Sequence, residues 1–295
     1  MAEVYHIPAL LNETIEGLNI KPEGVYVDVT FGGGGHSRAI LAAGAGHLYS
    51  FDQDKDALQN AIEDERWTFV HSNFRYLRNW MDYYGVDGID GLLADLGVSF
   101  HHFDCPERGF SFRFSAPLDM RMNQTAKRTA ADIVNTYSED ELAQIFWLYG
   151  ELKSGRGIAR NICKARTQRP IERTEDLVAA SRIPAEMSKE LARLFQALRI
   201  EVNDEMGALR EMLVAARDLL KPGGRIAILT YHSLEDRLVK NFLRSGNIEG
   251  TIEKDFYGNI LTPFELIEKG RTACAEEVEK NPRSRSAKLR IAEKK

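Results

Sequence analysis

Residues 25–38 read Val25-Tyr-Val-Asp-Val-Thr-Phe-Gly-Gly-Gly-Gly-His-Ser-Arg38. A short β-branched run breaks into four glycines and then reads as a helix start, which predicts a strand, a turn and a helix. A second apolar run, His47 to Phe51, ends on Asp52. Nucleotide-binding α/β folds place an acid here to bind ribose hydroxyls. The two features together predict a cofactor that contains adenosine.

The glycine spacing narrows the choice of cofactor. A dinucleotide fingerprint needs a third glycine, but that position falls on Ser37 or Arg38. The chain also has no Gly-x-x-x-x-Gly-Lys-Ser/Thr phosphate loop. What remains, Asp28-x-x-x-Gly32-x-Gly34, resembles the first motif of S-adenosylmethionine (AdoMet) methyltransferases, where the helix N-terminus would face the methionine carboxylate. A nicotinamide-dependent oxidoreductase is the alternative.

Composition is that of an ordinary globular protein, with 295 residues, 43% hydrophobic and 28% charged. No run of eighteen apolar residues occurs and the first residues do not read as a signal peptide, so we expect a cytoplasmic protein without a membrane partner. The three cysteines lie far apart and include no Cys-x-x-Cys pair, which predicts neither a disulfide framework nor a metal site.

Net charge is 39 − 44 = −5, which argues against a protein that coats nucleic acid non-specifically. The basic residues are nevertheless concentrated in two zones, between residues 150 and 173 and in the last thirteen residues. In the first zone a helix would carry one basic stripe, formed by Lys153, Arg156, Arg160 and Lys164. Such a stripe is typical of a solvated face or of a phosphate-binding surface.

Apolar β-rich runs recur along the chain and alternate with helix-length segments, which predicts a doubly wound parallel sheet. The expected strands are Val25–Thr30, His47–Phe51, Thr68–His71, Gly91–Ala94 and Arg225–Tyr231, with a half-exposed edge strand at Ser286–Ala292. This alternation of strands and helices stops in residues 105–199, where only helices are expected. The five expected helices are Thr129–Val134, Glu139–Tyr149, Gly155–Arg166, Glu175–Ala180 and Met187–Leu198. We therefore predict a discontinuous sheet domain, residues 1–104 and 200–295, with an all-helical domain, 105–199, inserted in it.

Several polar groups follow the strands. Asp95 ends the fourth one, where a carboxylate could stabilise a sulfonium or accept a hydrogen bond from an amine, or simply cap a turn. After the last central strand, Ser233 and Asp236 have capping-box spacing, and we expect His232 and Arg237 to face the same edge as Asp95.

Two further segments have two interpretations each. The stretch Arg108–Met122 alternates aromatic or apolar residues with charged ones, so it could stack on unpaired bases or place its apolar side in the core. The cluster His101-His102-Phe103-Asp104-Cys105 has metal-ligating residue types, but no second ligand pair accompanies it, so no metal is expected.

Seven blocks of this chain, in order from His6 to Ala292, together closely resemble the bacterial 16S ribosomal RNA (cytosine-N4) methyltransferase family, called RsmH or MraW. The blocks are Asp28–Arg38, Asp95–Ser99, Glu107–Phe112, Pro117–Met122, Phe195–Ile200, His232–Arg237 and Asn281–Ser286. The resemblance implies a Rossmann-like class I AdoMet-dependent methyltransferase fold with an inserted all-helical domain that binds the RNA substrate. The implied activity is methylation of the exocyclic N4 of one cytidine in the decoding region of 16S rRNA, free or within the small ribosomal subunit.

The resemblance also implies a set of cofactor-binding residues: Gly34, Gly35, His36, Asp52, Phe74, Asp95 and His102. Asp52 would bind the ribose hydroxyls and Phe74 would pack on adenine. His102 departs from the family pattern, because it stands where the motif Ser-x-Gln-Leu-Asp has glutamine. Our hypothesis for catalysis is that Asp95, or a neighbour such as His232, accepts a hydrogen bond from cytosine N4. The rival is a non-catalytic RNA-binding or assembly protein with a vestigial cofactor pocket.

Overall fold

The structure, a computed structural model, describes residues 8–97 and 106–295. The chain forms two compact units, a sheet unit of Met1–Gly97 with Met206–Lys295 and a helical unit of Val98–Glu205. The boundaries predicted from the sequence, after residues 104 and 199, lie seven and six residues from those in the structure. At the second boundary the reason is visible, because the helix expected to end at Leu198 continues to Asn203.

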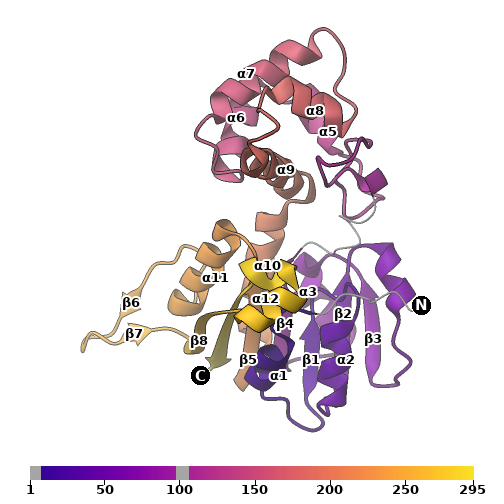
Figure 1. Ribbon diagram of the computed structural model, residues 1–295. Helices are drawn as coiled ribbons and strands as arrows, with labels where there is room; N and C mark the ends of the chain where they lie inside the picture. Colours follow the sequence, from indigo (N-terminus) through magenta and orange to yellow (C-terminus); the bar gives the residue numbers. More distant parts are fainter. Residues whose placement is uncertain (1–7, 98–105) are drawn as a thin grey trace. The chain divides into compact units, whose positions relative to one another are not determined.

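The sheet unit is built on seven strands in the order β3-β2-β1-β4-β5-β9-β8 (Figure 1). The strands are β1 Val25–Asp28, β2 His47–Asp52, β3 Trp67–His71, β4 Ile89–Asp95, β5 Leu220–Thr230, β8 Phe264–Thr272 and β9 Lys288–Lys294. The first five are parallel, while β9 is antiparallel to both β5 and β8. The predicted doubly wound α/β sheet is therefore confirmed, with its helical insert following β4.

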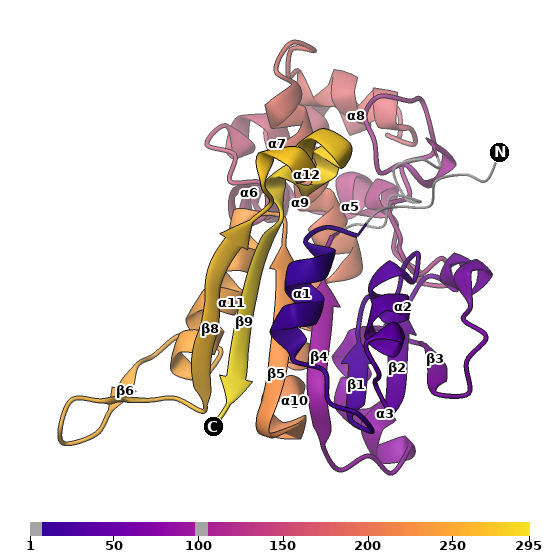
Figure 2. The same cartoon turned by 60° about the horizontal axis from the view of Figure 1, so that its bottom comes forward.

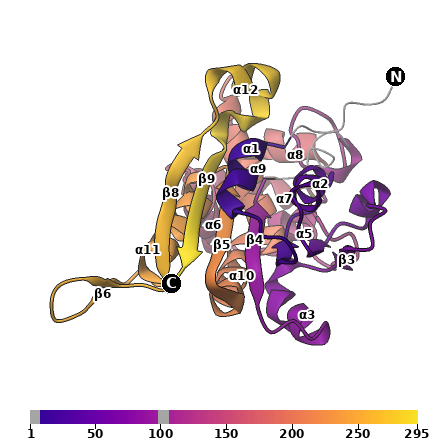
Figure 3. The same cartoon turned by 90° about the horizontal axis from the view of Figure 1, so that it is seen from below.

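Helices cover both faces of this sheet (Figure 3). They are α1 Leu11–Leu18, α2 Gly35–Ala42, α3 Leu77–Tyr83, α10 Glu205–Leu219, α11 Ser233–Ser245 and α12 Ala275–Lys280, with short 3-10 turns η1 Lys55–Asn60, η2 Phe74–Tyr76 and η4 Pro282–Ser286. The central strands are buried on both faces: Leu92, Leu93 and Ala94 of β4 are fully inaccessible to solvent. This explains why they read as continuous apolar runs rather than alternating ones.

The prediction that the last strand forms a half-exposed edge was wrong. β9 lies inside the sheet, and β8, which the sequence analysis missed, forms the edge. The register between β8 and β9 shifts twice, between Leu266 and Glu268 and between Lys269 and Arg271. Burial alternates along β8, but two of its less exposed positions are Glu268 and Gly270, so the sequence lacks an alternating apolar pattern. The polar residue Arg290 is tolerated in the inner strand because Asp236 accepts a hydrogen bond from its Nε at 2.7 Å.

The helical unit contains α5 Ala130–Thr136, α6 Glu139–Leu148, α7 Gly155–Arg166, α8 Thr174–Ser181 and α9 Ser188–Asn203, after a 3-10 turn, η3, at Pro106–Arg108. All five predicted helices are confirmed. Their apolar faces enclose a separate core that includes Phe146, Ile162 and Leu194. Capping boxes begin α5 at Thr129 and α6 at Ser138.

The aromatic stretch Arg108–Met122 mainly serves this helical core. Phe110, Leu118 and Met120 are buried, and the ring of Phe112 lies 5.7 Å from that of Phe195. The core interpretation of this segment is the one that its burial supports.

A second sheet of two short strands, β6 Glu253–Lys254 and β7 Ile260–Leu261, forms a hairpin that reaches out beyond β8 and α11 (Figure 2). None of the helices in the described parts of the chain is both long and apolar enough to cross a membrane.

Candidate functional site

The glycine turn between β1 and α2 has a backbone that side chains would obstruct. Gly34 has a φ of 73°, a left-handed conformation, and a Cβ added there would come within 2.9 Å of the Phe31 ring. A Cβ added at Gly35 would overlap Pro8. The bare turn lets a ligand approach the backbone and the first N–H groups of α2.

Asp52, at the end of β2, is hydrogen-bonded to this turn. Its Oδ2 accepts from the backbone N–H of Gly32 at 2.9 Å, and its Oδ1 accepts from the N–H of Asp54 at 2.8 Å. Burial raises the pKa of Asp52 to about 6. Because a carboxylate has about four acceptor positions, two remain for other donors. This chemistry suits a vicinal diol.

His36 and Asp95 meet at the other side of the turn. His36 Nδ1 lies 3.7 Å from Asp95 Oδ2, and the two side chains are only 7% and 15% exposed. The backbone N–H of Asp95 donates to Thr30 Oγ1 at 2.7 Å, which ties the end of β4 to the residues before the glycines. Within the described part of the chain, the buried His36 Nε2 has no hydrogen-bond partner. A buried polar atom without a partner marks a place where a ligand can bind.

Asp28, the acid of the first motif, has a structural role in the turn. It is buried, and it accepts from Ser37 Oγ at 2.6 Å and from the N–H of Thr30 at 3.0 Å. Ser37 is bonded in turn to Ser50 at 2.8 Å, and Trp67 Nε1 donates to Ser50 at 3.0 Å. Burial raises the pKa of Asp28 despite these bonds. The network fixes β1, β2, β3 and α2 relative to one another.

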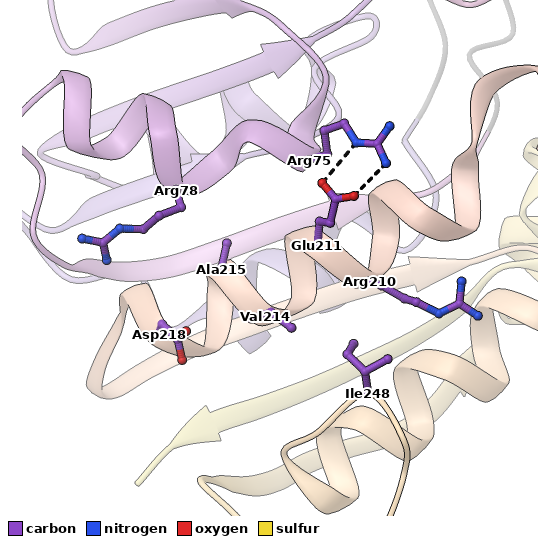
Figure 4. Close-up of a pocket in the computed structure, with 8 residues that line it drawn as sticks. All are labelled: Arg75, Arg78, Arg210, Glu211, Val214, Ala215, Asp218 and Ile248. Carbon is purple, nitrogen blue, oxygen red and sulfur yellow. Dashed lines mark hydrogen bonds and ion pairs between the residues drawn. The ribbon is translucent and has the colours of Figure 1, made fainter.

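Phe74 follows β3 and begins η2 at the same edge of the sheet. The N–H of Ser72 donates to the carbonyl of Asp52 at 2.9 Å, which places the segment beside the end of β2. The next residue, Arg75, is paired with Glu211 of α10 through contacts of 2.8 and 3.2 Å (Figure 4). This pair therefore helps to hold η2 in position.

The groove drawn in Figure 4 has a volume of about 620 Å³. Its lining residues are Arg75, Arg78, Arg210, Glu211, Val214, Ala215, Asp218 and Ile248. None of the predicted cofactor residues is among them. The groove is thus distinct from the cluster around the glycine turn.

The residues after β5 differ from the sequence prediction. His232, not Ser233, caps α11: its Nδ1 accepts from the N–H of Glu235 at 3.5 Å, and its Nε2 lies 3.0 Å from Glu235 Oε1. Asp236 pairs with β9 instead of forming a capping box. His232 follows β5, whose Leu229 pairs with Asp95 in the sheet, and its side chain contacts Glu235 there.

Tyr231, which the sequence analysis did not single out, hydrogen-bonds to Asp95 through its side chain. Burial and the neighbouring charge of Asp95 strongly raise the pKa of Tyr231, so the phenol stays protonated and can donate to the carboxylate. Its ring also lies against Gly97, where an added Cβ would come within 2.8 Å of it. The sequence feature that could have identified Tyr231 is its position directly after a central strand, at the edge where ligands bind.

The structure thus brings together Gly34, Gly35, His36, Asp52 and Asp95 around one turn, with Phe74 at the next strand end. His102, with His101 and Cys105, lies outside the described residues. Three residues of the predicted basic stripe, Arg156, Arg160 and Lys164, lie on α7 of the helical unit, whereas Lys153 precedes the helix. There Arg156 and Arg160 approach Asp140 and Glu139 of α6 at 3.5 and 3.4 Å, in largely exposed pairs.

Comparison with known proteins gives a consistent result. A family model described as the MraW methylase family matches residues 3–295. The ribosomal RNA small subunit methyltransferase H of Phocaeicola vulgatus is 60% identical, over 99% of this chain and 98% of its own. The proteins of the same name from Bacteroides thetaiotaomicron and Christiangramia forsetii are 57% and 51% identical, over 99% and 98% of this chain and 98% of each of theirs.

Proposed function

Since the chain belongs to the MraW methylase family, we propose that it transfers a methyl group from AdoMet to the RNA of the small ribosomal subunit. The observation that carries the proposal is the convergence of Asp52, His36 and Asp95 on one side-chain-free glycine turn. Because the chain belongs to this family, a nicotinamide-dependent oxidoreductase is no longer a candidate function. The proposed substrate is made in the cytoplasm, where the protein would act.

The cluster has the donors and acceptors that AdoMet requires. Asp52 accepts hydrogen bonds from the ribose hydroxyls, and Phe74 packs on the adenine. Gly34 and Gly35 admit the methionine end, whose carboxylate meets the N–H groups at the start of α2. His36 Nε2, which has no hydrogen-bond partner among the described residues, supplies one further polar contact. His102 completes the set by resemblance to the family.

At the finer level, we propose that the acceptor is the exocyclic N4 of one cytidine in the decoding region of 16S rRNA. AdoMet supplies an electrophilic methyl group on a sulfonium. Cytosine N4 is a poor nucleophile because its lone pair is delocalised into the ring. Asp95 accepts an N4 hydrogen bond and so localises that lone pair on nitrogen, once the base has left its stack. Tyr231 donates to the same carboxylate and orients it.

Because methyl transfer is a single displacement, the other tasks of the protein are to align the amine with the methyl group and to exclude water. We propose that the helical unit binds the RNA, with the α7 stripe contacting phosphates. Lys164 of α7, and Lys153 just before that helix, are exposed on the surface of that unit. The salt dependence of RNA binding would report such contacts.

The test is to replace Asp95 by asparagine and to measure two quantities separately. Calorimetry gives the affinity for AdoMet, and tritiated methyl transfer to small subunits that lack the modification gives turnover. We expect turnover to fall at least a hundredfold while the Kd for AdoMet changes less than fivefold. Asp90→Asn is the matched control, because Asp90 stands on the same strand near its opposite end and pairs with Lys221.

A parallel collapse of cofactor affinity in Asp95→Asn would make Asp95 a cofactor ligand only. If the unaltered protein binds AdoMet but transfers no methyl group to either rRNA or small subunits, the rival with a vestigial pocket is correct.

A further inference from the structure

The β6–β7 hairpin exposes two aromatic side chains almost completely. Phe256 is 98% exposed and Tyr257 is 86% exposed, at the turn between the strands. The hairpin reaches away from β8 and α11 in each of the three views (Figures 1 to 3). Smaller apolar side chains extend the surface, namely Ile260, Leu261 and Ile267. Large apolar side chains that are exposed together on one projecting element mark an interaction site.

Hydrogen bonds define the turn that carries the two rings. Asp255 accepts hydrogen bonds from the N–H of Tyr257, the N–H of Asn259 and the Asn259 side chain, each at 2.8 Å. These bonds, that of the Asn259 side chain first, lower the pKa of Asp255. The rings of Phe256 and Tyr257 meet edge to face, with centroids 5.7 Å apart.

The hairpin gains little stability from its own packing. All four residues of β6 and β7 are exposed, and an isolated two-stranded hairpin is only marginally stable in water. The aromatic pair therefore adds nothing to the core of the sheet unit. A partner that buries both rings would supply the stabilisation that the hairpin lacks.

The charge of the segment indicates which kind of partner fits. Between residues 249 and 265 the acids are Glu249, Glu253, Asp255 and Glu265, and the single base is Lys254. The three glutamates are exposed. An acidic surface is repelled by RNA phosphates but complements a basic protein. Proteins that bind rRNA are rich in lysine and arginine, so a small ribosomal particle contains basic proteins.

We propose that the β6–β7 hairpin docks on a basic protein surface of the assembled small subunit and inserts Phe256 and Tyr257 into an apolar recess there. The proposal rests on the proposed function, because it takes the small-subunit particle as the substrate. It adds a second recognition site, one that distinguishes the assembled particle from protein-free rRNA.

The test compares binding to two probes, small subunits lacking the modification and protein-free 16S rRNA. In Phe256→Ser/Tyr257→Ser we expect the Kd for subunits to rise at least tenfold and the Kd for free rRNA to stay within twofold. Glu249→Gln/Glu253→Gln should weaken subunit binding in the same selective way. Tyr83→Ser is the matched control, since Tyr83 is a 76% exposed aromatic on α3.

Equal losses for both probes would mean that the hairpin contacts RNA, and no loss for either would mean that it is not a docking site. A change in oligomeric state on ultracentrifugation would mean that the rings bind a second copy. Each of these results overturns the proposal. Binding is measured without methyl transfer, so a failure of the proposed activity is seen separately.

Discussion

At the scale of single residues, the burial of Asp52 and its proposed binding of ribose favour opposite protonation states of its carboxyl group. Its burial beside the glycine turn raises its pKa to about 6 from the ordinary 3.8. Because the folded pKa lies above the unfolded one, ionisation of Asp52 lowers the stability of the free protein as the pH rises from about 4 to 6. Two ribose hydroxyls donating to the carboxylate would favour its ionised form and reverse that effect.

We therefore predict that AdoMet affinity falls as the pH drops through 6, by at most about tenfold per pH unit below it. Calorimetry between pH 5 and 8, in buffers of different ionisation enthalpy, measures both the Kd and the proton released on binding. Asp52→Asn should weaken binding about 10- to 100-fold and flatten the profile, whereas the exposed Glu63→Gln should leave it unchanged. A flat profile in the unaltered protein would contradict this role.

Tyr231 provides a second prediction at this scale. Tyr231→Phe keeps the ring against Gly97 but removes the donor to Asp95. We expect kcat to fall about tenfold, the equivalent of one hydrogen bond, with the AdoMet Kd changed less than threefold. Tyr49→Phe, at a half-buried tyrosine of β2, is the control. If cofactor affinity falls as much as kcat does, Tyr231 is not acting through Asp95.

At the scale of secondary-structure elements, one buried ion pair joins α11 to β9. Arg290 is 8% exposed, and it donates to Asp236 at 2.7 Å, while Lys288 donates to the same carboxylate at 3.0 Å. Burial alone would raise the pKa of Asp236, but Arg290 and Lys288 outweigh it and the pKa lies below its ordinary value. The contribution of Asp236 to stability is therefore present at neutral pH and lost only as the pH falls below about 4.

Asp236→Ala should lower the free energy of unfolding by about 3 kcal/mol, because it leaves a buried guanidinium uncompensated. Asp82→Ala is the matched control, since it breaks an exposed pair with Arg78 on α3 and should cost less than about 0.5 kcal/mol. Urea denaturation at neutral pH measures both. Equal losses would show that the α11–β9 pair is no stronger than a surface one.

At the scale of the whole molecule, the chain forms a sheet unit and a helical unit with separate cores. If the helical unit binds RNA through α7, Lys153→Ala/Lys164→Ala should weaken RNA binding uniformly across sequences. The slope of log Kd against the logarithm of the salt concentration should decrease by about one to two. Lys189→Ala, at an exposed lysine of α9, should leave the slope unchanged. An unaltered slope in the double variant would place the RNA contacts elsewhere.

Much of the fold could be predicted from the sequence because its signals are local. The run from Val25 to Arg38 contains a strand, a turn and a helix start within fourteen residues, and the structure has β1 and α2 there. Helix periodicity likewise predicted α5 to α9. The chain itself carries the glycines and acids of the motif, which is why the family could be inferred before any contact was known.

Contacts between distant segments required the tertiary structure. The sequence determined that Asp95 ends a strand, but only the folded sheet places His36 and Tyr231 beside it. The same holds for β8, whose less exposed positions include Glu268 and Gly270 rather than apolar residues, and for the exposed turn at Phe256. Local propensity acts over a few residues, whereas strand neighbours, burial and side-chain partners depend on parts of the chain that only folding brings together.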